Sequence, residues 1–273
     1  MRSWLREESE QIRQTSALIG DLAGLGFAPI TTSPTRDSEV RRDHTLAIIE
    51  RLASWSPSAL DFPIKIFSSG PIFERGRWAE SLDVEVLEDE ALPSAALIFD
   101  LLSELISERS RLTRSDNLVF VVGHLGLLRD LLGQCGLSAA AAAAVETAFA
   151  HGYWARGEQM ISGADAALLP LFRPSPVEFA EAALADSARR YPQLRWEAWQ
   201  SELPRQLQPV PSLSWDLSLT GSWPYYSGPV FALYARGQGD ALLKGGRFSV
   251  HYQDRDWHGV GFTISLPQWF ERR

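Results

Sequence analysis

The sequence predicts an α+β fold, in which a mostly antiparallel sheet is flanked by helices and interrupted by a helical insertion. Short β-favouring runs occur in the first half of the chain and return near its end, where Val230 to Tyr234 follow a Gly-Pro pair. Between them the composition changes to alanine-rich and amphipathic helical sequence over residues 138–207. This order predicts one domain over residues 1–273, with 138–207 inserted between the two halves of one sheet.

Length and charge limit the classes of protein to which the chain can belong. A chain of 273 residues with 45% hydrophobic content can bury a sizeable core, which excludes a disordered protein. Its 26 basic and 34 acidic residues give a net charge of −8. Nucleic-acid binders usually carry a basic face that neutralises phosphates. We therefore do not expect tRNA to be a ligand.

The cysteine content and the N-terminus indicate a soluble, cytoplasmic protein. Cys135 is the single cysteine, so one chain can form neither an internal disulfide nor a cysteine-based zinc site. The N-terminus lacks the apolar region of a signal peptide, and no apolar run reaches the ~18 residues of a membrane span. Asp254, Asp256 and His258 fit a solvated turn better than a metal site. No metal and no cofactor are expected.

Two helices are predicted near the N-terminus. Apolar residues recur at near-helical spacing from Trp4 to Leu25, and Gly26 supplies a stop. Asp43 can cap a second helix, because an apolar stripe follows it at Leu46, Ile49, Leu52 and Ala53. Capping is one of two roles open to Asp43, and ligand binding is the other.

The middle of the chain predicts a buried strand followed by helices. Asn117 to Val122 read as the strand, and His124 in the glycine-rich turn after it is expected to be a polar strand-end group rather than a catalytic base. Ser175 to Glu178 have the spacing of a capping box with proline at the first helical position, so a helix is expected there that ends near Tyr191. Trp196 and Trp199 can share one face of a further short helix.

Several pieces of the chain resemble one family. The sequence from Asp216 to Phe231 reads DLSLTGSWPYYSGPVF, and GGRF and GVGFTISL follow it. These are similar to DxS…YYTGxxF, GGRYD and GxGFxxxLxxL of histidyl-tRNA synthetases and of their non-catalytic paralogue, the regulatory subunit of ATP phosphoribosyltransferase. Earlier pieces that resemble the family lie at Phe27–Pro34, Val40–Thr45 and Ser68–Arg77. The resemblance implies a class II aminoacyl-tRNA synthetase catalytic-like domain.

The resemblance also implies a histidine-binding site. In the synthetase an acidic residue and a threonine hold the amino group of histidine, and they correspond to Asp43 and Thr45. The family's ligand-binding glutamate corresponds to Glu85, and its tandem tyrosines to Tyr225 and Tyr226.

Positions that the synthetase needs for catalysis are altered. The two class II arginines that hold ATP correspond to Glu74 and Gln268, and the arginine that activates histidine corresponds to Gly221. At the first position repulsion replaces attraction, which changes the interaction by several kcal/mol at ~4 Å even at an effective dielectric of about 20. Phe248 replaces a tyrosine. The chain is therefore expected to be a pseudoenzyme with no catalytic residue and no anticodon-binding domain.

These features favour a regulatory subunit of ATP phosphoribosyltransferase in histidine biosynthesis. The resemblance implies that it activates a short catalytic subunit within a hetero-oligomer, as a homodimer, and relays allosteric feedback by L-histidine. Two alternatives stay open. One is a tRNA-independent enzyme that adenylates or transfers an amino acid, and the other is an orphan scaffold or binding protein with the same fold.

Overall fold

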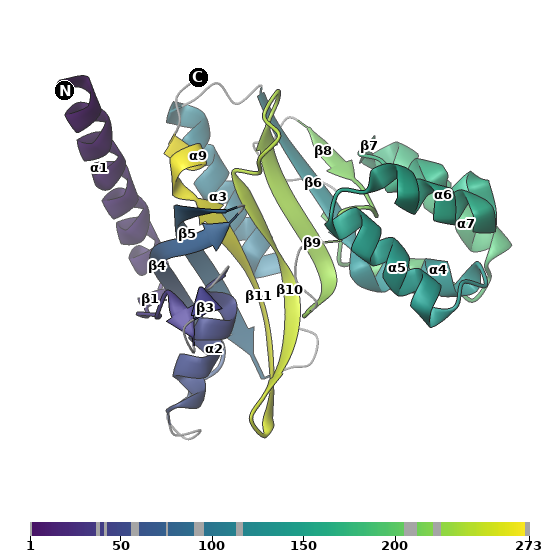
Figure 1. Ribbon diagram of the computed structural model, residues 1–273, viewed down its shortest axis with the longest axis horizontal. Helices are drawn as coiled ribbons and strands as arrows, with labels where there is room; N and C mark the ends of the chain where they lie inside the picture. Colours follow the sequence, from purple (N-terminus) through teal and green to yellow (C-terminus); the bar gives the residue numbers. More distant parts are fainter. Residues whose placement is uncertain are drawn as a thin grey trace. The chain divides into compact units, whose positions relative to one another are not determined.

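The protein is described by a computed structural model that divides into two compact units (Figure 1). The residues that it describes are 2–36, 39–40, 43–55, 60–74, 76–89, 96–112, 117–204, 212–220 and 225–270. Unit 1 comprises Met1–Pro93, Asp240–Lys244 and Ser249–Arg273, and unit 2 comprises Ser94–Gly239 and Gly245–Phe248. Strand β10 (Leu243–Tyr252) contributes residues to both.

Unit 1 combines helices at its chain ends with long antiparallel strands. Its helices are α1 (Arg2–Gly24), α2 (Thr45–Ala53) and α9 (Leu266–Phe270). Its strands besides β10 are β1 (Ala28–Pro29), β2 (Thr35–Arg36), β3 (Glu39–Val40), β4 (Ile64–Glu74), β5 (Arg77–Glu88) and β11 (Arg255–Ser265). The predicted first helix is confirmed, and Gly26 after it has a positive φ of 85°, a conformation that glycine adopts without steric cost.

The long strands of unit 1 fix which side chains share a face. Strands β4 and β5 form a hairpin, and β11 pairs antiparallel with β5, so that Glu85 lies opposite Ile66 on one side and Gly261 on the other. Figure 1 shows the three strands side by side. Strand β1 adds to β4 in parallel. Apolar residues of β5 and of α2 are buried: Leu82, Val84, Val86, Ile48, Ile49 and Leu52.

Unit 2 contains a smaller set of strands and most of the helices. Its helices are α3 (Ala96–Leu112), α4 (Leu125–Gln134), α5 (Ala139–Ala150), α6 (Trp154–Asp165), the 3-10 helix η3 (Ala166–Phe172), α7 (Val177–Arg190) and α8 (Trp196–Gln200). Its strands besides β10 are β6 (Leu118–His124), β7 (Ser175–Pro176), β8 (Leu213–Trp215) and β9 (Tyr226–Ala235). The strand predicted from Asn117 and the short tryptophan helix are confirmed.

An aromatic cluster holds the core of unit 2 together. Phe120 of β6 stacks on Phe231 of β9 with ring centroids 5.8 Å apart, and Phe99 of α3 lies 5.4 Å from Phe231. Strand β6 pairs antiparallel with β9 and parallel with β8. Because β4–β5, β5–β11, β6–β9 and β7–β8 are all antiparallel, the prediction of a mostly antiparallel sheet is confirmed.

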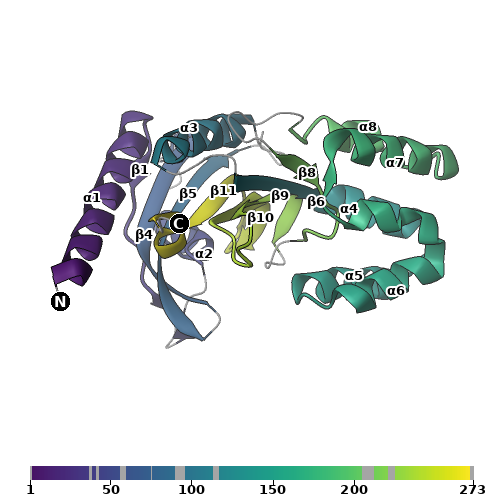
Figure 2. The same ribbon diagram turned by 90° about the horizontal axis from the view of Figure 1, so that it is seen from above.

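Helices α4 to α8 form a helical segment in which neighbouring helices contact one another. Figure 2 shows α5 beside α6 and α7 beside α8, and the neighbouring elements in each pair are in contact. The expected capping box at Ser175 is wrong. Pro176 is extended and is itself the N-cap, so α7 begins one residue later, and the Ser175 hydroxyl donates to the carbonyl of Arg173 instead.

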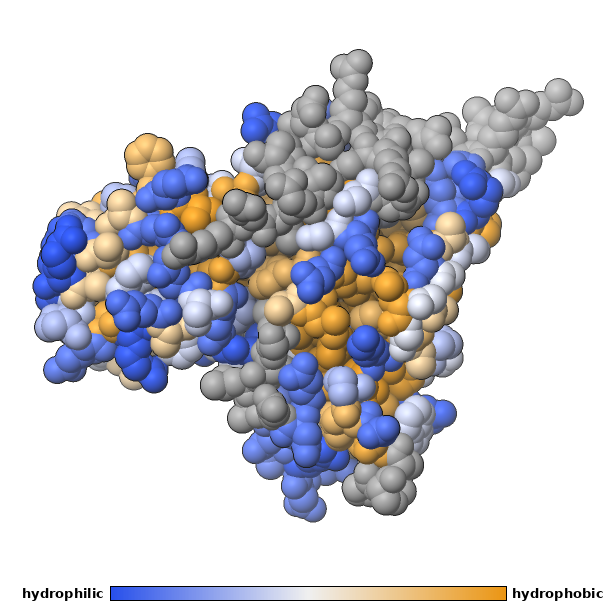
Figure 3. All heavy atoms as spheres, turned by 180° about the vertical axis from the view of Figure 1, so that it is seen from behind, coloured by the Kyte–Doolittle hydropathy of each residue, from blue (hydrophilic) through white to orange (hydrophobic). Residues whose placement is uncertain are grey.

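Apolar side chains are also found at the surface. Figure 3 shows hydrophobic residues gathered in one area of the face turned away in Figure 1. Large side chains that are strongly exposed include Ile12 and Trp78 of unit 1, and Tyr153, Trp154 and Phe179 of unit 2. No helix in the described part of the chain is long and apolar enough to cross a membrane.

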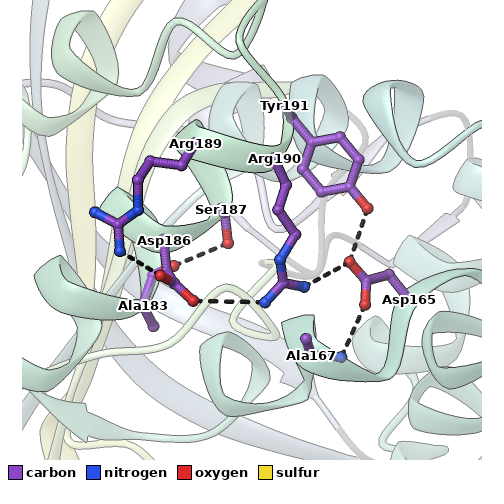
Figure 4. Close-up of polar contacts among 8 residues, drawn as sticks. All are labelled: Asp165, Ala167, Ala183, Asp186, Ser187, Arg189, Arg190 and Tyr191. Carbon is purple, nitrogen blue, oxygen red and sulfur yellow. Dashed lines mark hydrogen bonds and ion pairs between the residues drawn. The ribbon is translucent and has the colours of Figure 1, made fainter.

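A polar network joins the end of α6 to the end of α7 (Figure 4). Asp165 accepts hydrogen bonds from the Ala167 amide at 2.9 Å, the Tyr191 hydroxyl at 2.8 Å and the Arg190 guanidinium at 3.0 Å. The Ala167 bond is the largest of several contributions that lower the pKa of Asp165. Arg190 also reaches Asp186, which pairs with Arg189. These contacts lie at the surface of the helical segment.

Candidate functional site

The first turn of α2 meets the middle of β5 in unit 1. Thr45 donates a hydrogen bond of 2.6 Å from its hydroxyl to Oε1 of Glu85, and both side chains are buried. Asp43 is also buried, and its Oδ1 accepts a hydrogen bond of 3.3 Å from the amide of Leu46. The N-terminal end of α2 therefore presents a carboxylate and a hydroxyl beside a second acidic group, which belongs to the sheet.

Glu85 is a buried acid with an unsatisfied oxygen. Its Oε2 has no hydrogen-bond partner among the described residues. Burial raises the pKa of Glu85 well above the usual range, the Thr45 hydrogen bond opposes the rise, and the charges of Asp83 and Asp43 add to it. A protonated Glu85 satisfies these conditions without an unpaired buried charge.

Gly261 makes room for the Glu85 side chain. The two residues are paired across β11 and β5, and a Cβ on Gly261 would lie 1.7 Å from Oε2 of Glu85. Even the smallest side chain at this position would collide with the carboxyl group. The glycine therefore permits the orientation that Glu85 adopts.

Asp83 lies two residues before Glu85 and faces the same side of the sheet. It accepts hydrogen bonds from the hydroxyls of Thr263, at 2.6 Å, and Ser81, at 3.2 Å. Burial raises the pKa of Asp83, whereas His44, both hydroxyls and Lys244 oppose the rise. We call Asp43, Asp83 and Glu85 the carboxylate cluster.

His44 lies between Asp43 and Thr45 and holds the start of α2 in place. It is the N-cap residue, and its Nδ1 shares a hydrogen bond of 2.6 Å with the hydroxyl of Thr32, which in turn contacts the hydroxyl of Ser68. Its Nε2 lies 3.4 Å from the carbonyl oxygen of Gly70. These contacts tie α2 to β4.

The tandem tyrosines form a second group, in unit 2. Their rings are 5.3 Å apart in an edge-to-face arrangement, and Tyr225 also contacts the buried Phe248 at 6.2 Å. A Cβ on Gly246 would lie 3.1 Å from the Tyr226 ring. Of the five residues predicted to bind histidine, the structure thus brings Thr45 and Glu85 into contact, and Tyr225 and Tyr226 into contact with each other.

The altered positions are described in part. Glu74 ends β4, with its side chain outside the description, and Gly221 lies outside the described residues. Gln268 lies in α9, where its amide oxygen accepts a hydrogen bond from the Ser265 hydroxyl.

Unit 2 contains a charged cluster that the sequence did not predict. Arg247 donates from Nη1 to Oε2 of Glu202 at 2.6 Å, and its side chain is only 4% exposed. The same oxygen lies 3.2 Å from Nε2 of His124. Nδ1 of His124 accepts a hydrogen bond from the Leu127 amide and caps α4, so Nε2 carries the proton that is donated to Glu202.

The protonation states of this cluster follow from its contacts. Burial lowers the pKa of His124, so the ring is neutral. Burial alone would raise the pKa of Glu202, but the hydrogen bond from His124 and the charge of Arg247 bring it below its usual value. We call these three residues the paired cluster, because one negative and one positive charge balance within it.

Sequence reasoning missed His44, Asp83, Gly261 and the paired cluster. Asp83 and Glu85 are two residues apart in a predicted strand and therefore lie on the same face. This spacing could have identified Asp83 as a neighbour of Glu85. Among the described residues, no group of three or more His, Cys, Asp and Glu side chains is arranged to hold a metal ion.

The family model for histidyl-tRNA synthetase matches residues 82–268, which is more than half of the chain. The chain belongs to the histidyl-tRNA synthetase family. The match includes Asp83 and Glu85 of the carboxylate cluster and all of the paired cluster. No curated protein matches the chain by sequence.

Solved structures place the histidyl-tRNA synthetase family fold over nearly the whole chain. A histidyl-tRNA synthetase from Nostoc sp. is 17% identical with a TM-score of 0.76, over 96% of this chain and 71% of that one. An ATP phosphoribosyltransferase regulatory subunit/histidyl-tRNA synthetase from Bacillus halodurans C is also 17% identical, with a TM-score of 0.68, over 98% of this chain and 79% of that one. A chain of the ATP phosphoribosyltransferase (HisG:HisZ) complex from Thermotoga maritima is 17% identical with a TM-score of 0.63, over 94% of this chain and 97% of that one. The predicted class II fold is confirmed.

Proposed function

We propose that this chain is a non-catalytic regulatory subunit of ATP phosphoribosyltransferase, which activates a short catalytic subunit and relays feedback by L-histidine. The observation that carries the proposal is an asymmetry within the family site. The acidic residues that would hold an amino group are buried together, whereas the positions that would hold ATP no longer carry arginine.

Gln268 supports the loss of ATP chemistry. A neutral amide cannot supply the charge-assisted, bidentate contact with phosphate that an arginine makes. Its amide oxygen moreover accepts a hydrogen bond from the hydroxyl of Ser265, the last residue of β11. Glu74 would add repulsion at the other of the two ATP-binding positions.

In the proposed histidine site of unit 1, Asp43, Thr45 and Glu85 hold the amino group. Feedback then requires that histidine bind one quaternary state of the complex better than another, because a ligand shifts an equilibrium only by its difference in affinity between two states.

A protein partner is supported by two observations. A similar chain from Thermotoga maritima was solved in a HisG:HisZ complex. In this chain, apolar residues gather in one area of the surface (Figure 3), and exposed apolar areas of this kind are typical of sites of protein association.

The proposal is tested by mixing the purified chain with a short-form catalytic subunit. We expect a hetero-oligomer in sedimentation analysis, phosphoribosyl transfer that depends on this chain, and inhibition of that activity by L-histidine. Absence of both a complex and any change in activity would contradict the proposal. ATP–pyrophosphate exchange with any amino acid would instead identify an adenylating enzyme.

A further inference from the structure

Among the described residues, the carboxylate cluster places like charges together with no cation that acts on Glu85. Asp83 and Asp43 both act on Glu85 electrostatically, and Glu85 accepts a hydrogen bond from the neutral hydroxyl of Thr45. The basic groups His44 and Lys244 act on Asp83. Glu85 therefore has two acidic neighbours and an oxygen that lacks a donor among the described residues.

Two chemical states resolve this arrangement. In the first, Glu85 carries a proton, which removes the buried charge. In the second, a cationic donor approaches Oε2 and makes the ionised carboxylate favourable. A primary ammonium group suits the second state, because it offers three donors to a cluster that consists of acceptors. The two states are mutually exclusive at the same oxygen.

We propose that a ligand ammonium group binds to the carboxylate cluster by displacing a proton from Glu85, so that ligand binding by this chain is coupled to proton release. This inference rests on the proposed histidine site and adds its regulation. The O–H bond of Glu85 breaks, the proton goes to solvent, and the ammonium group keeps its own protons and donates hydrogen bonds to the carboxylate.

The coupling makes ligand affinity depend on pH. While Glu85 is protonated in the free protein and ionised in the complex, release of one proton raises the association constant about tenfold for each pH unit. The dependence ends at the pH where free Glu85 is itself ionised. A rising pH thus strengthens feedback by the ligand, and an acid shift relieves it.

The experiment is isothermal titration of the full chain with L-histidine at about pH 6, in phosphate and in bis-Tris, which differ in heat of ionisation. The difference in observed heat gives the number of protons released. Because the ligand imidazole also titrates, Glu85→Gln is the reference. We expect one more proton released by the wild type than by the variant.

If Glu85→Gln no longer binds L-histidine, carboxyl carbon NMR of glutamate-labelled wild-type protein measures the titration of Glu85 directly. We expect the Glu85 signal to titrate well above the ordinary glutamate range in the free protein, and to move to lower pH with saturating L-histidine. Thr45→Val should move the free-protein titration to higher pH, because it removes the hydrogen bond that favours the ionised form.

Three outcomes would overturn the inference: equal proton release by wild type and variant, ordinary titration of free Glu85, or no binding of either L-histidine or histamine. Sedimentation with the short catalytic subunit is run on the same samples. A complex without proton coupling would refute the inference alone, whereas proton-coupled histidine binding without a complex would refute the regulatory role alone.

Discussion

The carboxylate cluster of unit 1 and the paired cluster of unit 2 bury charge in opposite ways. In the paired cluster, the guanidinium of Arg247 and the ring of His124 both donate to one oxygen of Glu202. In the carboxylate cluster, the charges of Asp83 and Asp43 oppose ionisation of Glu85, and one oxygen of Glu85 lacks a donor among the described residues.

The difference separates structural from functional burial of charge. In the paired cluster the two charges balance each other, although Nε and Nη2 of Arg247 have no hydrogen-bond partner among the described residues. Like charges gathered without compensation cost stability, and strongly perturbed acids of this kind cluster at functional sites. The described residues thus leave the charge of an ionised Glu85 unbalanced in unit 1 and balance the charge of Glu202 in unit 2, and each prediction below tests one side of that contrast.

The largest effect is expected from Glu202→Gln. The substitution keeps the shape of the side chain but leaves Arg247 as a buried cation without a counterion, which should lower the free energy of unfolding by about 3 kcal/mol. Urea denaturation measures the change. Glu146→Gln is the matched control, because the Arg129–Glu146 pair is partly exposed and should contribute less than about 1 kcal/mol. Equal effects at the two positions would contradict the expectation that the buried Arg247–Glu202 pair stabilises the fold more than the exposed pair.

Gly261→Ala should have the next largest effect. The new methyl group would collide with Oε2 of Glu85 and force the carboxyl out of place, at a cost of about 2 kcal/mol in stability. Histidine binding should be lost as well. Gly133→Ala is the control, since that glycine lies in α4 with open space around it. Loss of binding without loss of stability would show that the sheet accommodates the methyl group.

Glu85→Gln should change the pH dependence of stability. Folding raises the pKa of Glu85, so between the unfolded and the folded pKa the native state binds more protons than the unfolded state. Wild-type stability therefore falls as the pH rises from the unfolded pKa to the folded pKa. The variant lacks this loss and should be more stable than wild type by about 1 kcal/mol at about pH 7, with a smaller difference at about pH 4. Parallel pH profiles would show that Glu85 ionises normally.

The smallest effect is expected in the exposed network of Figure 4, which provides a baseline. Tyr191→Phe removes one hydrogen bond to Asp165 and should cost about 0.5 kcal/mol, because solvent screens the remaining charges. The pKa of Asp165 is lowered, so stabilisation by this network is present at neutral pH and lost under acid conditions. Thermal unfolding of wild type and variant at both pH values measures it.

Much of the fold could be predicted because local patterns agreed with it. The buried strand β6 reads as an unbroken apolar run, and α1 and α2 have apolar residues at helical spacing. The start of α7 was misplaced because the dipeptide Ser175-Pro176 is compatible with two N-cap positions, and local sequence did not decide between them.

The site was predicted less completely, for a different physical reason. Asp43, Thr45 and Glu85 could be named from resemblance, but the contact of Asp83 with Thr263 depends on the register between β5 and β11. A shift of one residue would turn either side chain to the other face. The paired cluster likewise joins residues that are far apart in sequence.

The parallel pairing of β6 with β8 has a consequence for synthesis of the chain. Strand β6 leaves the ribosome before α4 to α8, and its two partners, β8 and β9, follow only after that whole helical segment. The apolar strand β6 therefore remains without its partner strands while the helices form from local contacts. The nascent chain should be most prone to aggregation, and most dependent on chaperones, during this interval.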